Sequence, residues 1–177
     1  DYSRYPVAEV RTPRQVLTAK LEKICARLDA APSRTVAYRD WLRHLPNEAR
    51  VEASALWVVG SYARGALTCG DIDLVFECKG QGSLMPSRTL TKAFLGAPAL
   101  VRTYVGTPTQ NESGAQFDEA VLIWQPGLDW RAALEAITPD AAVSRFARPH
   151  DAIPLRVEQF RSCSVEWEDV VRLRDEG

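Results

Sequence analysis

The chain has 177 residues, of which 46% are hydrophobic and 25% are charged, with a formal net charge of −1. This length and apolar content predict one compact globular domain with a real core, and they exclude a wholly disordered chain. The near-zero charge argues against extended duplex nucleic acid as a partner, because that interaction needs a clear basic excess. No apolar run approaches the roughly 20 residues of a membrane-spanning helix, so no membrane partner is expected.

Residues 1–12 show little periodicity and are expected to form an extended arm. Apolar residues at steps of three and four then predict an amphipathic helix over residues 13–28. A second helix is predicted over residues 36–45, because its larger apolar residues fall on one stripe. Residues 1–50 are therefore expected to be an N-terminal region of arm and helices.

The central part of the chain alternates between predicted strands and helices. Residues 55–59 are a short apolar run and residues 71–78 become mostly apolar, so both predict buried strands. A helix is expected over residues 87–95. Two further strands are expected over residues 99–105 and 116–124, joined as a hairpin by a polar loop.

The C-terminal part is punctuated by prolines. A helix is predicted over residues 130–137, and another short helix over residues 167–173. Residues 51–128 are therefore expected to form the core domain, and residues 129–177 a short helical extension.

The cysteines point to a cytoplasmic protein. The four cysteines lie far apart in the sequence and form no Cys-x-x-Cys pair: Cys25, Cys69, Cys78 and Cys163. The two histidines complete no zinc-binding pattern with them. We interpret them as reduced thiols. Two disulfide bonds in a secreted protein are the alternative.

One stretch, residues 60–76, carries most of the chemistry and reads GSYARGALTCGDIDLVF. Gly60 ends a predicted strand, and its lack of a Cβ lets a ligand approach the backbone. Ser61 adds a hydroxyl, and the turn after it exposes backbone N–H groups of the kind that bind phosphate. Arg64 follows one helical turn later and can place a guanidinium on the same phosphate.

Two aspartates follow this turn on the next predicted strand. Asp71 and Asp73 are two residues apart, so both carboxylates project from one face. Such a pair suits Mg²⁺, which binds through one or two carboxylates together with substrate phosphates. A phosphate-binding turn beside paired carboxylates predicts phosphoryl or nucleotidyl transfer. The plainer alternative is solvated charge beside a turn, although the apolar residues that follow argue against an exposed strand edge.

The segment GSYARGALTCGDID resembles the signature G-S-[FY]-x-R-G-x-x-T-x-G-D-x-D of family X DNA polymerases. These enzymes belong to the DNA polymerase β-like nucleotidyltransferase superfamily. The resemblance implies an α/β (α+β) fold, a nucleotidyltransferase palm with a small mixed sheet and helices packed on one face. It also implies a group of nucleotide-binding residues: Gly60, Ser61, Arg64 and Gly70. The family often has a second arginine where this chain has Ala63.

The same resemblance implies that Asp71 and Asp73 ligate two Mg²⁺ ions, with Mn²⁺ as the alternative metal. The family uses a third carboxylate, from a later strand, as a metal ligand and proton acceptor. Asp118 in the predicted strand 116–124 is the candidate, which makes it catalytic and metal-binding together with the two earlier aspartates. A regular strand would direct Glu119 to the opposite face, so only one of the two neighbours can serve. The alternative for Asp118 is a solvated carboxylate at the strand entry.

By this resemblance the chain is an enzyme, a Mg²⁺-dependent nucleotidyltransferase. It would transfer a nucleoside monophosphate from an NTP, with ATP as the expected donor, to an acceptor and release pyrophosphate. A chain of this length holds a palm and little else, so the acceptor is expected to be non-templated: a protein partner, a small molecule or a nucleic-acid end. The alternative is a catalytically weak binding or regulatory module, such as an antitoxin-like subunit. An Asp118 remote from the other two aspartates would favour that alternative.

Overall fold

The structure is a computed structural model that describes residues 11–82 and 84–143. All of these residues belong to one compact unit, which ends at Val143. The helix expected over residues 167–173 lies outside the described residues, as does most of the expected N-terminal arm. Among the described helices, none is long and apolar enough to cross a membrane.

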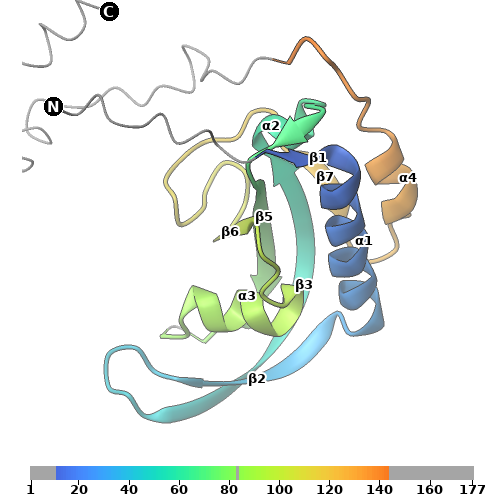
Figure 1. Cartoon of the computed structure of the whole chain (residues 1–177). Coiled ribbons are helices and arrows are strands. Elements are labelled where there is room, and N and C mark those ends of the chain that lie inside the picture. The colour runs from blue at the N-terminus through green and yellow to red at the C-terminus, as the bar shows by residue number, and fades with distance from the viewer. Residues whose placement is uncertain (1–10, 83, 144–177) are drawn as a thin grey trace, which may run out of the picture. The chain divides into compact units, whose positions relative to one another are not determined.

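The fold is α+β and is built on a mixed five-stranded sheet (Figure 1). Four strands lie side by side in the order β2 (Ser33–Arg39), β3 (Pro46–Val59), β5 (Ile72–Lys79) and β6 (Val101–Val105). The β5–β6 pair is parallel and the others are antiparallel. Two short strands, β1 (Thr12–Pro13) and β4 (Thr68–Cys69), pair separately.

The long central strand β3 has neighbours on both edges. Leu56 pairs with Phe76 of β5 on one edge and with Trp124 of β7 (Val121–Trp124) on the other. Glu52, further back along β3, pairs with both β5 and β2. Strands β2 and β7 therefore follow each other along the same edge of β3.

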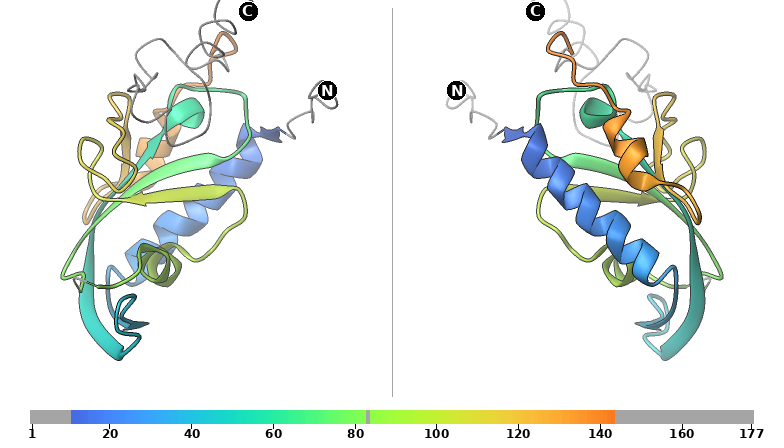
Figure 2. Two further views of the ribbon diagram at one scale, coloured as in Figure 1. Left: turned by 90° about the vertical axis from the view of Figure 1, so that its left-hand side faces the viewer. Right: turned by 90° about the vertical axis from the view of Figure 1, so that its right-hand side faces the viewer.

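Three helices pack on one face of the sheet (Figure 2): α1 (Arg14–Ala30), α3 (Ser87–Leu95) and α4 (Trp130–Glu135). The apolar residues of α1 that recur at steps of three and four are all buried in this core: Leu17, Leu21, Ile24 and Leu28. The α3 helix ends at Gly96, whose φ of +80° suits a glycine after a helix. The helices predicted over residues 13–28, 87–95 and 130–137 are thus confirmed.

Asp29 connects the end of α1 to two other elements. Its carboxylate accepts hydrogen bonds from Nε1 of Trp124 at 2.7 Å and Nε1 of Trp130 at 2.6 Å. Both indoles are buried, so each needs such a partner for its N–H group. One carboxylate therefore joins α1, β7 and α4.

The helix predicted over residues 36–45 is wrong, because the chain forms the β2–β3 hairpin there. Asp40 is 4% exposed, and its Oδ1 accepts from the backbone N–H groups of Leu42 and Arg43 at 2.7 and 2.8 Å. These local bonds favour a turn over a helix. The apolar residues of the predicted stripe lie at or near this turn and are more than half exposed: Trp41, Leu42 and Leu45.

The strands predicted over residues 99–105 and 116–124 correspond to β6 and a shorter β7, but they do not form a hairpin. β6 lies at the outer edge beside β5, whereas β7 lies on the far side of β3. The loop of residues 106–120 therefore crosses the sheet between them. The boundaries expected at residues 50 and 128 fall inside this unit, within β3 and just before α4.

Candidate active site

Asp71 and Asp73 lie at the start of β5. Asp73 pairs with Arg102 of β6 in the parallel ladder, so the two side chains share one face of the sheet. The alternate residues of β5, Ile72 and Leu74, enter the helix-covered core on the other face. Asp71 precedes the strand, and its Oδ2 lies 2.9 Å from Nε of Arg102. Both aspartates therefore lie near the same arginine, on the face that the helices leave open.

The carboxylates give this part of the site an excess of negative charge. Burial, followed by the charge of Asp71, raises the pKa of Asp73, whereas Arg102 and a hydrogen bond from Tyr104 lower it. That bond is long, with Oη of Tyr104 lying 3.5 Å from Oδ1 of Asp73. The raising effects prevail, and burial is the largest of them, so the surroundings of Asp73 favour its neutral form more than water does.

The predicted phosphate-binding turn lies directly against Asp73. It is the single helical turn α2 (Gly60–Ala63), which begins where β3 ends. Gly60 has a φ of +70°, and a Cβ there would lie 3.3 Å from Oδ2 of Asp73. Only glycine gives this approach without crowding the carboxylate. Ser61 is half-buried, and its hydroxyl makes no hydrogen bond with a described residue. Gly70 immediately precedes Asp71 in the sequence.

The buried side chain of Arg14 fixes this turn through hydrogen bonds to its backbone. Arg14 is 9% exposed, and its Nη1 donates to the carbonyl oxygens of Tyr62 at 2.9 Å and Ala66 at 3.2 Å. Its Nη2 donates to the carbonyl of Ile137 at 3.3 Å, and its guanidinium lies 3.9 Å from the centroid of the Tyr62 ring. One guanidinium therefore joins α1 to the turn and to the segment after α4.

Gly65 provides a second close approach. Its φ is +97°, and a Cβ there would lie 2.4 Å from the carbonyl oxygen of Thr138. We expect Gly65→Ala to lower the free energy of unfolding by about 3 kcal/mol, because it combines backbone strain with overpacking. Urea unfolding measures this loss. Gly127→Ala is the matched control, since Gly127 has a φ of +83° but nothing within 4 Å; we expect it to cost about 1 kcal/mol. Equal losses would show that the Thr138 contact is unimportant.

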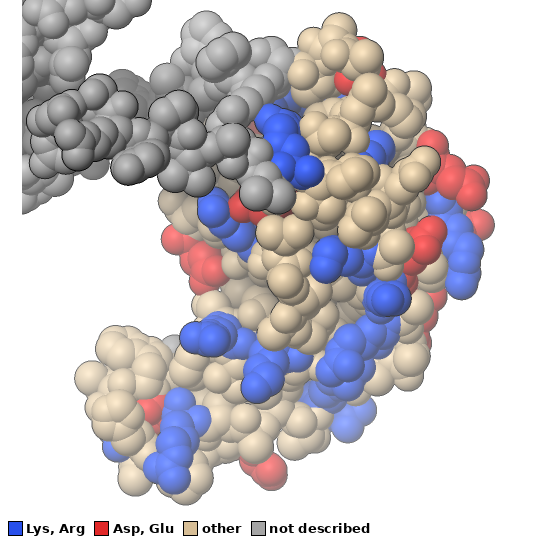
Figure 3. Space-filling model, viewed as in Figure 1, with Lys and Arg blue, Asp and Glu red and all other residues tan. Residues whose placement is uncertain are grey.

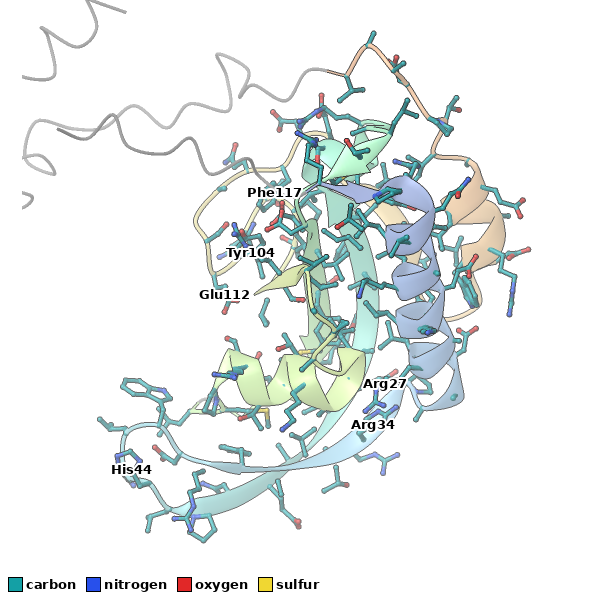
Figure 4. All side chains as sticks on the ribbon, in the orientation of Figure 1. Arg27, Arg34, His44, Tyr104, Glu112 and Phe117 are labelled. Atoms are coloured by element: carbon teal, nitrogen blue, oxygen red, sulfur yellow. The ribbon has the colours of Figure 1, made fainter. Side chains whose placement is uncertain are left out.

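The 106–120 loop reaches the site at two points. The ring of Phe117 stacks on Tyr104 at a centroid distance of 5.8 Å, and Figure 4 shows the two side by side. Two residues later, Oε2 of Glu119 lies 3.6 Å from Nη1 of Arg64. The loop therefore contacts both the aromatic neighbour of Asp73 and the predicted phosphate-binding arginine.

The third carboxylate expected at Asp118 is not in place. The predicted strand begins only at Val121, because the backbone turns before it and Ala120 N donates to Phe117 O at 3.2 Å. Asp118 is exposed in this turn, whereas its two neighbours contact the site. Within the described residues, no group of three or more His, Cys, Asp and Glu side chains is placed to hold a metal ion.

The donors that are in place fit a magnesium ion bound together with its substrate. Mg²⁺ usually takes one or two protein carboxylates and completes its coordination with phosphate oxygens and water. Asp71 and Asp73 supply that number. The pKa of Asp73 is raised first by burial and then by the charge of Asp71, so a bound cation would stabilise a carboxylate whose charged form is incompletely solvated. A metal site that takes three or more of its ligands from His, Cys, Asp and Glu side chains does not fit the described residues.

Sequence reasoning missed Arg102 and Tyr104, and it named Glu119 only as the neighbour of Asp118, without predicting its contact with Arg64. The first two alternate along β6, so strand periodicity would have placed them on one face. Nothing local indicates that β6 pairs with β5, and this pairing is what brings them to the aspartates. Tyr62, which belongs to the same motif, is 1% exposed and packs beneath Arg14.

The basic residues that follow the second predicted strand do not extend the site. Arg88 and Lys92 line a pocket of about 420 Å³ beside Val101 and Thr103. Strand alternation places these two β6 residues on the face opposite Arg102. Figure 3 shows Lys and Arg side chains gathered over α1 and α3, which cover that other face.

Two of the described cysteines, Cys25 and Cys78, are poor nucleophiles. Cys25, Cys69 and Cys78 are free. Burial and Asp29 raise the pKa of Cys25 to about 12, and burial and Glu77 raise that of Cys78 to about 11. Neither thiol is therefore appreciably ionised at neutral pH.

Comparison with protein-family models, with curated proteins and with solved structures finds no match to this chain. The proposed function therefore rests on the resemblance of residues 60–73 to the family X signature and on the geometry of these residues.

Proposed function

We propose that the chain is a Mg²⁺-dependent nucleotidyltransferase whose α+β unit serves as a nucleotidyltransferase palm. It transfers a nucleoside monophosphate from an NTP, expected to be ATP, to a non-templated acceptor and releases pyrophosphate. The observation that carries this proposal is the close approach of the Gly60 turn to Asp73. If residue 60 had a Cβ atom, it would lie 3.3 Å from Oδ2 of Asp73. This contact brings a phosphate-binding turn and a metal-binding carboxylate within reach of one triphosphate.

The residues of the motif bind either the triphosphate or the metal in this proposal. The Ser61 hydroxyl and the Arg64 guanidinium bind the outer phosphates, and the backbone at Gly60 and Gly70 allows their close approach. Asp71 and Asp73 hold the metal. Tyr104 orients Asp73 through its hydrogen bond to that carboxylate.

In the proposed reaction the acceptor hydroxyl attacks the α-phosphorus in line, the bond between this phosphorus and the α,β-bridging oxygen breaks, the hydroxyl proton passes to solvent water, and pyrophosphate leaves. Mg²⁺, when bound with the triphosphate, neutralises phosphate charge and stabilises the leaving group. The residues of the chain contribute mainly by position and charge, as is usual in phosphoryl transfer. The free thiols suit a cytoplasmic setting, and the acceptor is a protein, a small molecule or a nucleic-acid end.

The position of Asp118 favours a second candidate function. A two-ion site needs a further carboxylate, and the described residues do not group one with Asp71 and Asp73. A catalytically weak binding or regulatory module, such as an antitoxin-like subunit, would bind the metal and triphosphate without transferring the nucleotide.

The two candidates give different results with α-³²P-labelled NTPs. The full chain is incubated with each of the four labelled ribonucleotides and Mg²⁺ or Mn²⁺, with and without cell lysate as a source of acceptors. A transferase labels an acceptor and releases pyrophosphate, and the Asp71→Asn/Asp73→Asn double variant does neither. Metal-dependent binding without transfer supports the binding module. Absence of both binding and transfer contradicts both candidates.

A further inference from the structure

Both charged parts of the candidate site are paired with residues outside the motif. Asp71, a predicted metal ligand, is paired with Arg102 of β6, with 2.9 Å between Oδ2 and Nε. Arg64, a predicted phosphate ligand, is paired with Glu119 of the 106–120 loop, with 3.6 Å between Nη1 and Oε2. Asp71, which would bind a metal cation, is therefore already paired with a cation, and Arg64, which would bind a phosphate anion, is already paired with an anion.

We propose that Arg102 and Glu119 are internal substitutes for the ligands of this site. Arg102 takes the place of the divalent cation at Asp71, and Glu119 takes the place of a phosphate at Arg64. Binding of a metal–triphosphate exchanges both pairs, because it supplies a cation and an anion at the same time. This inference rests on the proposed function, and it assigns that site a mode of regulation and a further phosphate-binding residue.

The further phosphate-binding residue is Arg102. Its side chain is 69% exposed and that of Asp71 is 30% exposed, so their pair contacts solvent and is easily opened. Once released, the guanidinium remains next to Asp73, its partner in the β5–β6 ladder. It then lies beside the metal-bound phosphates, which the forked geometry of arginine suits well.

The pair of Arg64 and Glu119 is better shielded from water than the pair of Arg102 and Asp71. The side chains of Arg64 and Glu119 are 20% and 36% exposed, which strengthens their attraction relative to a fully solvated pair. A triphosphate competes for Arg64 with several negative charges and more acceptor oxygens. Displacement of Glu119 also moves the loop that carries Phe117, whose ring stacks on Tyr104. Because Tyr104 contacts Asp73, the two exchanges are physically connected.

The chain offers a matched pair of variants for Glu119. Glu119→Gln removes the competing charge and keeps the shape, so we expect ATP with Mg²⁺ to bind about fivefold more tightly. Asp118→Asn makes the same charge change at the adjacent, exposed position, and we expect unchanged affinity. Isothermal titration of the full chain measures both. Equal affinities for wild type and Glu119→Gln, or equal gains in both variants, would overturn the role of Glu119.

Arg102 has a split readout that a merely structural role would not produce. In Arg102→Gln, Mn²⁺ alone should bind about threefold more tightly, because its competitor is gone. ATP with Mg²⁺ should bind about tenfold more weakly, because a charged phosphate contact is lost. Arg102→Lys should restore most of the ATP affinity. Mn²⁺ is followed by electron paramagnetic resonance and ATP by calorimetry, and a change of the same sign for both would overturn the exchange at Arg102.

The two levels of inference fail in different ways. If the wild-type chain binds Mn²⁺ and ATP but these variants behave like it, the exchange is wrong and the proposed function stands. If neither the wild type nor any variant binds Mn²⁺ or ATP, the proposed function and the exchange are both wrong.

Discussion

Replacing Asp73 with asparagine is expected to abolish nucleotidyl transfer and to stabilise the fold. Transition-state stabilisation by a metal is worth several kcal/mol, and each 1.4 kcal/mol corresponds to a factor of ten in rate. We therefore expect transfer to fall by about 100- to 1000-fold. The label-transfer assay measures this loss, once an acceptor has been found.

The gain in stability follows from the pKa of Asp73. Burial and Asp71 raise this pKa, so the folded state holds the proton more tightly than the unfolded state. The resulting stability is fully present below the unfolded pKa and is lost as the pH rises through the folded pKa. Asparagine stays neutral, so the Tm of Asp73→Asn should exceed that of the wild type at pH 7. The difference should shrink as the pH falls through the acidic range.

Glu77 provides the control for this experiment. It lies on the same strand as Asp73 and, by alternation, on the same face of the sheet, but four residues further along the strand and away from the Gly60 turn. Glu77→Gln should leave transfer unchanged. Loss of transfer in Asp73→Asn together with a lower Tm would indicate a structural role for Asp73, and retained transfer would exclude it from the reaction.

Replacing Arg14 with methionine is expected to cost about 3 kcal/mol of unfolding free energy, since hydrogen bonds from a buried charged donor are among the strongest. The variant leaves three carbonyl oxygens without that donor: those of Tyr62, Ala66 and Ile137. Arg14→Lys should lose an intermediate amount, because an ammonium group cannot reproduce the forked geometry of the guanidinium. Urea unfolding, with an unchanged m-value, measures both losses.

Arg88→Met is the matched control for Arg14→Met. Arg88 is exposed on α3, and its guanidinium makes no hydrogen bond with a described residue. Its replacement should change the unfolding free energy by no more than about 0.5 kcal/mol. A similar cost for the two variants would show that Arg14 does not hold the turn between β3 and β4.

The structure confirms the predictions that depend on local pattern. The helices α1 and α3 follow from apolar residues repeated at helical spacing, and β5 follows from a short apolar run. The motif between β3 and β5 has a similar local basis. A glycine with positive φ begins the turn, and the two aspartates are separated by one core residue, Ile72. Each of these features is decided by residues that are close to one another in the sequence.

The β2–β3 hairpin shows where local pattern is insufficient. Its apolar residues fit a helical stripe, but Val36 and its neighbours pair with β3 instead, and the Asp40 carboxylate stabilises the turn. A short segment with mixed periodicity is decided by the partner that becomes available in the fold, which here is an adjacent strand.

By itself, the sequence determined α1, α3, α4, β5 and the placing of the Gly60 turn shortly before two aspartates. Only the tertiary structure decided what surrounds them. Tyr104 contacts Asp73 across 31 residues of sequence, and Arg14 contacts Ile137 across 123. Strand order brought Arg102 to Asp71, and the turn before β7 left Asp118 exposed while Glu119 contacts Arg64. Local spacing sets which face a side chain takes, but the packing of distant segments sets what that face meets.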